Sequence, residues 1–312
     1  QDYARHLRAV SEAVRAVQPE AQIGIGIYSS SQPWGTYVLK AAAGSYDFVV
    51  GHYYDSTNPY EHEVERVALG ANYQMLNHVL RVNATIAHFN PDGRAYQLDT
   101  EWGLMGAARP GDRTPARYWR NANIVGTLHR AVRMIYYARE GMLRGASGWE
   151  MFARLHQVSF GFLTRDAPEK RFMLYWLYYH FNRHCGEAAL DVTGTAPWYE
   201  APHAPEASGP VTPALVTLSE DGREMYLVIA NGSWDDDYPC TVALANFQTS
   251  GAVGRCLSQD DRDANPLVGR ESDVVKELPI DLARSEASFN VPAHSVVFVR
   301  LQKAASAQTT GR

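Results

Sequence analysis

Acidic and aromatic side chains gather where predicted strands end, and these residues are the ones that could do chemistry. In a parallel α/β sheet, catalytic residues lie at the carboxyl ends of the strands. Aromatic rings stack on the C–H faces of sugars, while carboxylates and hydroxyls form hydrogen bonds with sugar hydroxyls. The combination predicts a carbohydrate site. Its candidate residues are Tyr28, Trp34, His52, Tyr54, Glu101, Trp149 and Glu150.

Glu101 is the sharpest candidate catalyst. Alternation along the third predicted strand puts Gln97, Asp99 and Glu101 on one face. Leu98 and Trp102 suit the opposite face, where helices pack. We therefore expect the first three side chains to point into a barrel, with Glu101 at its rim. Inward carboxylates are costly unless they are paired or used, so the spacing fits a structural ion pair as well as a catalytic role.

His52 and Tyr54 share a face of the neighbouring predicted strand. A Tyr hydroxyl near Glu101 would hold that carboxylate and favour its ionised form. A lone His is more often a core residue bonded to the backbone. Trp149 fits either a sugar platform or a core residue at the barrel top, and Trp34, in a predicted loop, leaves the same two alternatives.

Strands and helices alternate through the first part of the chain. The first helix ends before Pro19 and has an apolar face formed by Tyr3, Leu7, Val10, Val14 and Val17. Four short apolar runs follow in alternation with further helices. This pattern predicts a parallel sheet with right-handed crossovers. The predicted strands are residues 23–28, 48–54, 96–102 and 145–152.

The pattern changes near residue 191, where prolines become frequent and helical periodicity ends. Short apolar runs separated by Gly turns predict an antiparallel sandwich. The predicted strands are residues 214–218, 224–229, 241–245 and 296–301. We therefore expect a barrel part over 1–190, a β-sandwich over 191–302 and a flexible tail over 303–312.

Composition excludes several classes of protein. The 312 residues include 29 basic and 34 acidic ones, so the net charge is 29 − 34 = −5 and no basic stripe exists to bind nucleic acid. No apolar run approaches the roughly 20 residues of a membrane span, and no signal-peptide pattern opens the sequence.

The cysteine spacing argues against a zinc site. We expect Cys185 to be a free, buried thiol, and Cys240 could pair with Cys256 in an oxidising compartment.

Four segments resemble clan A glycoside hydrolases, most closely the family 51 α-L-arabinofuranosidases and next family 39. Residues 46–54 are similar to the sixth barrel strand with its His-Tyr end, and residues 98–103 to the seventh, where these enzymes carry a nucleophilic Glu before a Trp. Residues 175–186 resemble the last barrel helix, and residues 291–301 the final strands of the C-terminal sandwich.

The resemblance implies roles for individual residues. Glu101 would be the nucleophile, His52 and Tyr54 would line the sugar subsite, and Trp149 would lie on the eighth strand beside the substrate. The chain departs from family 51 in reading Thr100-Glu101-Trp102 where that family reads Asp-Glu-Trp. It also lacks the Asn-Glu pair that carries the acid/base on the fourth strand.

The resemblance therefore implies strands five to eight of a (β/α)8 barrel followed by a sandwich. We expect a retaining glycoside hydrolase acting on plant-type polysaccharide or oligosaccharide, with α-L-arabinofuranosidase as the first candidate. Its acid/base would lie outside this chain, on an N-terminal half-barrel from another chain or a missing segment. No cofactor or metal is implied. The sequence does not decide whether the protein is cytoplasmic, periplasmic or extracellular, although secretion is slightly favoured.

Three alternatives remain. The chain could be a non-catalytic carbohydrate-binding or scaffold half-barrel that keeps the aromatic platforms but lacks the acid. It could be an endo-glucanase or xylosidase of the same clan. It could also be a self-sufficient hydrolase that uses Glu101 together with Glu150, which requires both carboxylates to face one cavity.

Overall fold

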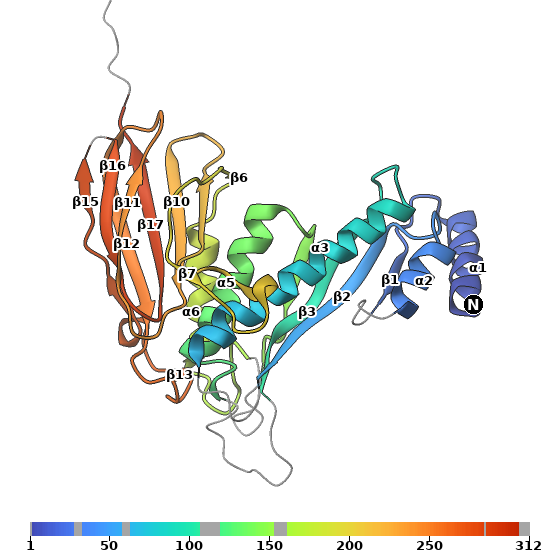
Figure 1. Ribbon diagram of the computed structural model, residues 1–312, viewed down its shortest axis with the longest axis horizontal. Helices are drawn as coiled ribbons and strands as arrows, with labels where there is room; N and C mark the ends of the chain where they lie inside the picture. The colour runs from blue at the N-terminus through green and yellow to red at the C-terminus, as the bar shows by residue number, and fades with distance from the viewer. Residues whose placement is uncertain are drawn as a thin grey trace, which may run out of the picture.

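The computed structural model describes residues 2–27, 33–57, 63–106, 119–152, 161–283 and 285–305. A parallel sheet and a β-sandwich lie on opposite sides of the molecule, with some of the helices between them and the N-terminal helix at the far end beyond the sheet (Figure 1). Tyr28, one of the predicted site residues, falls outside the described residues.

The parallel sheet has four strands in the order β1-β2-β3-β4. Each neighbouring pair is parallel, which confirms the sheet predicted from the alternation. Within the described ranges, no further strand pairs with the outer edge of β1 or of β4. The strands are β1 (Gly24–Gly26), β2 (Phe48–Thr57), β3 (Tyr96–Gly106) and β4 (Gly145–Gly148).

Helices cover one face of this sheet. Asn123 caps α5 by accepting a hydrogen bond from the Val125 N–H, and Gly141 ends it in the left-handed region, at φ 58°. Most of α5 is buried because it lies between the sheet and the sandwich (Figure 1). The helices are α1 (Asp2–Val17), α2 (Pro33–Ala41), the π-helical turn η1 (Arg66–Gly70), α3 (Ala71–Phe89), α5 (Ile124–Glu140) and α6 (Met173–Arg183).

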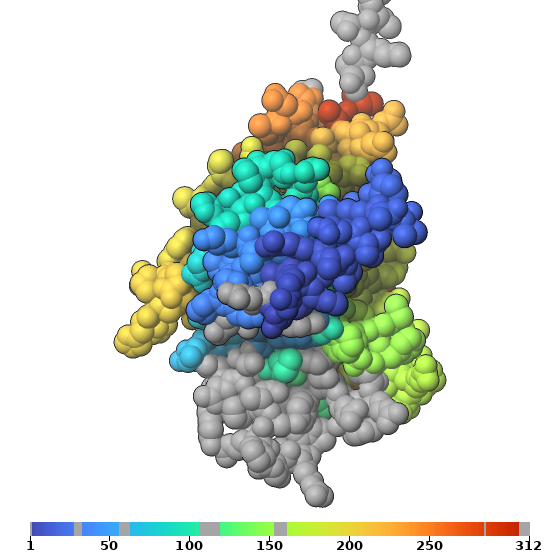
Figure 2. All heavy atoms as spheres, turned by 90° about the vertical axis from the view of Figure 1, so that its right-hand side faces the viewer, coloured from blue at the N-terminus to red at the C-terminus, as the bar shows by residue number. Residues whose placement is uncertain are grey.

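Most of the apolar face predicted for the first helix is exposed to solvent. Leu7 is buried, together with Ala4 and Ser11. Tyr3, Val10, Val14 and Val17 are exposed instead. Figure 2 views this end of the molecule, where α1, in dark blue, forms the outer surface. The helix therefore buries only a narrow stripe against the β1 side of the sheet.

The second part of the chain is an antiparallel sandwich, as predicted. Its six-stranded sheet has the order β14-β12-β17-β10-β9-β6, and its three-stranded sheet has the order β11-β16-β15. The strands are β6 (Ala188–Ala189), β9 (Ala214–Leu218), β10 (Glu224–Asn231), β11 (Tyr238–Ala243), β12 (Thr249–Ser258), β14 (Val275–Glu277), β15 (Asp281–Ala283), β16 (Glu286–Val291) and β17 (Ser295–Lys303).

Short elements join the two parts. Two two-stranded sheets form, one between β5 and β13 and one between β7 and β8. These elements are β5 (Arg171–Phe172), β7 (Trp198–Tyr199), β8 (Gly209–Pro210), β13 (Leu267–Val268) and the 3-10 turns η3 (Pro205–Ala207) and η4 (Glu271–Asp273).

The sequence pattern missed β12 because its two glycines read as turn residues. In the fold, Gly254 allows the chain after β14 to approach β12 closely, since an added Cβ would stand 2.7 Å from the Leu278 carbonyl oxygen. The glycine thus marks a close contact inside a strand rather than the end of one.

One hydrophobic core runs from the sheet through α5 into the sandwich. It includes Tyr53 and Trp102 from the sheet, Leu128 from α5 and Phe298 from β17. The sandwich therefore packs on the helices that cover the parallel sheet.

The three cysteines are unpaired. Cys256 is buried, whereas Cys185 is only half-buried, which corrects the prediction of a buried thiol. Burial raises the pKa of the Cys185 thiol, with an opposing hydrogen bond to Thr217.

Candidate active site

A β-bulge in β3 sets the direction of Glu101. Gly51 of β2 lies opposite Asp99, but the next residue, His52, lies opposite Glu101, so Thr100 is the extra residue. A bulge breaks the two-residue alternation of a strand and re-aims the side chains that follow it. Asp99 and Glu101 consequently point to opposite faces of the sheet, although they are two residues apart.

This bulge overturns part of the predicted facing. Asp99 is buried against the helices, where it contacts Tyr137 of α5, and Gln97 is buried on the same side by alternation. Neither side chain points into a barrel. Leu98 then falls on the other face, not among the helices as predicted. Trp102 does pack against α5, as expected, with its ring 5.8 Å from that of Tyr137.

Glu101, His52 and Tyr54 meet on the side of the sheet away from α5, which we call the Glu101 face. The Tyr54 hydroxyl donates to Glu101 Oε2 at 3.2 Å. His52 Nδ1 lies 3.5 Å from the same oxygen, and its Nε2 lies 3.0 Å from Thr100 Oγ1. The Glu101 side chain is 32% exposed. The structure thus brings together three of the predicted site residues around a carboxylate that solvent can reach.

Tyr54 is held as a neutral donor. Burial raises its pKa well above the ordinary value, and the neighbouring negative charge of Glu101 raises it further. A phenol that keeps its proton can stabilise the ionised Glu101 carboxylate through the whole neutral range.

Beneath Glu101 lies a buried polar network that the sequence reasoning did not identify. Asp99 accepts from the Tyr137 hydroxyl at 2.7 Å and from the Tyr53 backbone N–H at 3.3 Å. Burial raises the pKa of Asp99 to about 7, although the Tyr137 hydrogen bond and the Arg133 charge oppose this. Arg133 also pairs with the buried Asp55.

α5 also fixes the end of β4. Arg130 is fully buried and donates to the Trp149 carbonyl and, at 3.1 Å, to the Tyr178 hydroxyl. Its guanidinium lies 5.2 Å from the centre of the Trp102 ring. The Trp149 side chain stays 42% exposed. The backbone of Trp149 is thus anchored while its ring remains available for stacking.

The signal for this network was present in the sequence. His129, Arg130 and Arg133 interrupt the apolar run that forms α5, and all three are fully buried. Charged residues inside a buried helix need specific partners, so such an interruption indicates a polar network.

The remaining candidates lie elsewhere or are less defined. Trp34 is on α2 rather than in a loop, and its ring contacts Tyr3 of α1 at 5.5 Å. β4 ends at Gly148, so Trp149 and Glu150 follow the strand instead of lying within it as predicted. Its carboxyl is half-buried, and burial raises its pKa.

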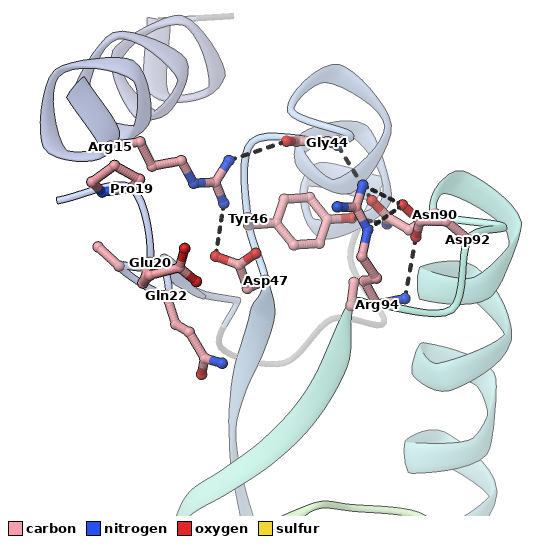
Figure 3. A pocket seen from close by; sticks show the side chains of 12 residues that line it. Arg15, Pro19, Glu20, Gln22, Gly44, Tyr46, Asp47, Asn90, Asp92 and Arg94 are labelled. Carbon is pink, nitrogen blue, oxygen red and sulfur yellow. Dashed lines mark hydrogen bonds and ion pairs between the residues drawn. The ribbon is translucent and has the colours of Figure 1, made fainter.

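A cavity of about 390 Å³ lies at the opposite end of the sheet. Its lining includes Gln22, Asp47 and Ala95, which lie within two residues of the starts of β1, β2 and β3. Figure 3 shows Arg15 reaching Asp47 there, at 2.7 Å. This amino-terminal end is where barrel residues serve stability, so the cavity is separate from the Glu101 face.

The described part of the chain holds no group of three or more His, Cys, Asp or Glu side chains placed to bind a metal ion. None of its helices is long and apolar enough to cross a membrane.

Comparisons with known proteins place the fold. No protein-family model and no curated protein matches the chain. Among solved structures, it is similar to the GH51 arabinofuranosidase from Xanthomonas axonopodis pv. citri, with a TM-score of 0.71 and 16% identity. The thermostable GH51 α-L-arabinofuranosidase from Thermotoga petrophila gives a TM-score of 0.74 and 15% identity. A Paenibacillus polymyxa xyloglucanase of family 44 gives 0.65 and 10%.

Each alignment covers 96% of this chain, but only 63%, 62% and 60% of those three chains respectively. The chain therefore has a clan A glycoside hydrolase-like fold and spans less than two thirds of these structures. Its four parallel strands and antiparallel sheets agree with a half-barrel joined to a sandwich.

Proposed function

We propose that the chain carries the nucleophile half of a retaining glycoside hydrolase, with Glu101 as the nucleophile. The observation that carries this proposal is the arrangement around Glu101 Oε2, which Tyr54 and His52 approach at 3.2 and 3.5 Å. Glu101 lies at the middle of the parallel strand β3, where the neighbouring strand β4 ends. Such a carboxyl group is oriented by its neighbours and accessible to solvent, as attack on an anomeric carbon requires.

We also propose that the second carboxyl group of the mechanism, the acid/base, lies outside this chain. Retention needs an acid/base about 5–5.5 Å from the nucleophile, which protonates the leaving oxygen and then activates water. A half-barrel from another chain or a further segment, carrying strands one to four, would complete the barrel beside β1 and β4. The present strands would be five to eight.

The substrate we propose is a plant-type polysaccharide or oligosaccharide. The GH51 neighbours make α-L-arabinofuranosidase the first candidate activity, and the xyloglucanase neighbour keeps endo-glucanase and xylosidase as alternatives. Trp149 would stack on the sugar ring beside Glu101, with His52 and Tyr54 binding its hydroxyls.

The decisive experiment separates the nucleophile from the missing acid. Dinitrophenyl glycosides need no proton on their leaving group, so they can react with a nucleophile when the acid/base is absent. We expect the chain, incubated with dinitrophenyl α-L-arabinofuranoside or β-D-xyloside, to gain one glycosyl unit on Glu101. Intact-mass and peptide mass spectrometry detect this adduct. Glu101→Gln should remove it without changing the thermal unfolding midpoint.

The same assay distinguishes the alternatives. Sugar binding measured by calorimetry without any adduct would favour the non-catalytic carbohydrate-binding protein. Turnover of methyl glycosides by the chain alone, lost in Glu150→Gln, would favour a self-sufficient pair of Glu101 and Glu150. An adduct on a residue other than Glu101 would refute the assignment.

A further inference from the structure

We infer that Asp99 is a positioning residue for Glu101: from the helix side of the sheet, its carboxylate holds the β-bulge that turns Glu101 onto the opposite face. The functional part of this inference rests on the proposed role of Glu101. The structural part does not, since it concerns only the contacts of the bulge.

The bulge leaves backbone donors that need an acceptor. An extra residue interrupts the ladder between two strands, and a buried N–H without a partner is costly. Asp99 Oδ1 accepts from the Tyr53 backbone N–H at 3.3 Å, across the interrupted register. The backbone N–H of Glu101 also lies close enough to this carboxylate to lower its pKa. One side chain thus ties β2 to the residue that carries the nucleophile.

α5 in turn holds the Asp99 carboxylate. The Tyr137 hydroxyl donates to Oδ2 at 2.7 Å and accepts from Arg133 Nη1 at 3.3 Å. Arg133 is fixed by its pairing with Asp55 and by a 2.6 Å hydrogen bond from its Nε to Asn72 Oδ1. A side chain restrained on both oxygens cannot rotate without disturbing the bulge.

The protonation state of Asp99 should control how firmly the bulge is held. Burial is the main cause that raises its pKa to about 7, and its hydrogen bonds lower it. Above this pH both oxygens accept, whereas below it one carries a proton and accepts weakly. The titratable and charged groups that face Asp99 or its partners are Tyr137, Arg133 and His129 on α5, Tyr54 and Asp55 on β2, Glu101 on β3 and Tyr178 on α6.

Backbone NMR tests the structural part directly. We expect the amide proton signals of Tyr53 and Glu101 to shift together with the carboxyl carbon of Asp99, with a common midpoint near pH 7. Tyr137→Phe should move this midpoint to higher pH, because the lost hydrogen bond favoured the ionised form. The inference would be overturned if the amide signals stay constant while Asp99 titrates, or if the midpoint of the Asp99 titration is the same in Tyr137→Phe as in the wild type.

The labelling assay tests the functional part. In Asp99→Asn we expect the rate of glycosylation of Glu101 to fall at least tenfold at pH 8, with little change in the concentration of glycoside that half-saturates labelling. The matched control is Asp47→Asn. Asp47 also accepts a backbone N–H, that of Ile23 at 2.7 Å, from the residue that precedes β1 at the amino end of the sheet. It should label at the wild-type rate.

The outcomes separate the two proposals. Equal slowing in both variants would show a general loss of sheet stability and would overturn the positioning role, as would wild-type labelling in a folded Asp99→Asn. If the wild-type chain gains no adduct at all, the proposed function fails, and the amide titration still decides whether Asp99 holds the bulge.

Discussion

Two carboxylates that are two residues apart have opposite environments. Glu101 is one-third exposed and receives the Tyr54 hydroxyl, whereas Asp99 is fully buried and receives Tyr137. In many active sites, two neighbouring carboxyl groups have different pKa values and different roles because their environments differ. Here it makes Glu101 accessible to a substrate and leaves Asp99 as a titrating support beneath it.

Tyr54→Phe should slow the labelling of Glu101 by roughly 10- to 100-fold. A hydrogen bond to a charged group contributes about 1.5–3 kcal/mol, and about 1.4 kcal/mol corresponds to a factor of ten. Mass spectrometry of the dinitrophenyl glycoside reaction measures the rate. The matched control is Tyr226→Phe, because Tyr226 donates to Glu224 in the sandwich, on β10. Equal rates in the two variants would contradict the role of Tyr54.

The pH dependence of stability should differ between the wild type and Asp99→Asn. Burial raises the pKa of Asp99 to about 7 in the folded protein, above about 3.9 in an unfolded chain. The folded state therefore holds this proton more tightly, so the wild type loses stability as pH rises through this window. Relative to the variant, the loss between pH 5 and pH 8 should reach about 3 kcal/mol at most. Urea unfolding between pH 5 and pH 8 measures it, and a constant difference would contradict the shift.

At the scale of elements, α5 is the helix that joins the site to the sandwich. It supplies Arg130 to the end of β4 and Arg133 to the pair with Asp55, while its apolar residues fill the common core. A helix with buried charges on one side and apolar contacts on the other cannot turn about its axis, because turning would separate the charges from their partners. This requirement makes α5 a rigid support for the residues beneath Glu101.

Arg133→Met should cost about 3–5 kcal/mol in the free energy of unfolding, because it leaves the buried Asp55 carboxylate without its guanidinium partner. The control is Arg94→Met, whose ion pair with Asp92 lies on the surface and should cost less than about 1 kcal/mol. Urea denaturation of both variants provides the comparison. Similar small losses would mean that the His129 contact alone sustains Asp55.

The sandwich depends on its last strand. β17 lies between β10 and β12 in the middle of the six-stranded sheet and pairs with both. Deleting residues 291–312 should collapse the sandwich and expose its apolar core. Soluble yield and binding of an apolar dye measure this. A chain that ends at Ala305 keeps β17 and should stay folded; a soluble, monomeric deletion variant would refute the expectation.

At the scale of the whole molecule, the sheet and the sandwich should unfold together. Phe298 of β17 is fully buried, and its ring lies 5.3 Å from that of His180 and 5.5 Å from that of His184, beside α6. Phe298→Ala should cost about 3–5 kcal/mol and shift one common transition. Calorimetry and circular dichroism check this; two separate transitions, only one of them shifted, would contradict a shared core.

Much of the architecture could be predicted from the sequence because regular elements repeat locally. Alternation of apolar strands and helices indicated the parallel sheet, and short runs between Gly turns indicated the sandwich. The same reasoning placed His52, Tyr54 and Glu101 together, since the ends of neighbouring parallel strands share one edge of a sheet. The contact of Tyr54 with Glu101 followed from this rule without any coordinates.

The tertiary structure alone decided the bulge at Thr100, the facing of Asp99 and the buried stripe of α1. A two-residue period predicts facing only while the register holds, and the register shifts at Thr100, where β3 pairs with a strand more than forty residues earlier. Likewise, the periodicity of α1 shows several apolar positions, but the sheet beside it covers only the stripe with Ala4 and Leu7. Local sequence sets the period of each element, whereas contacts between distant segments set its register, its rotation and the partners of its buried charges.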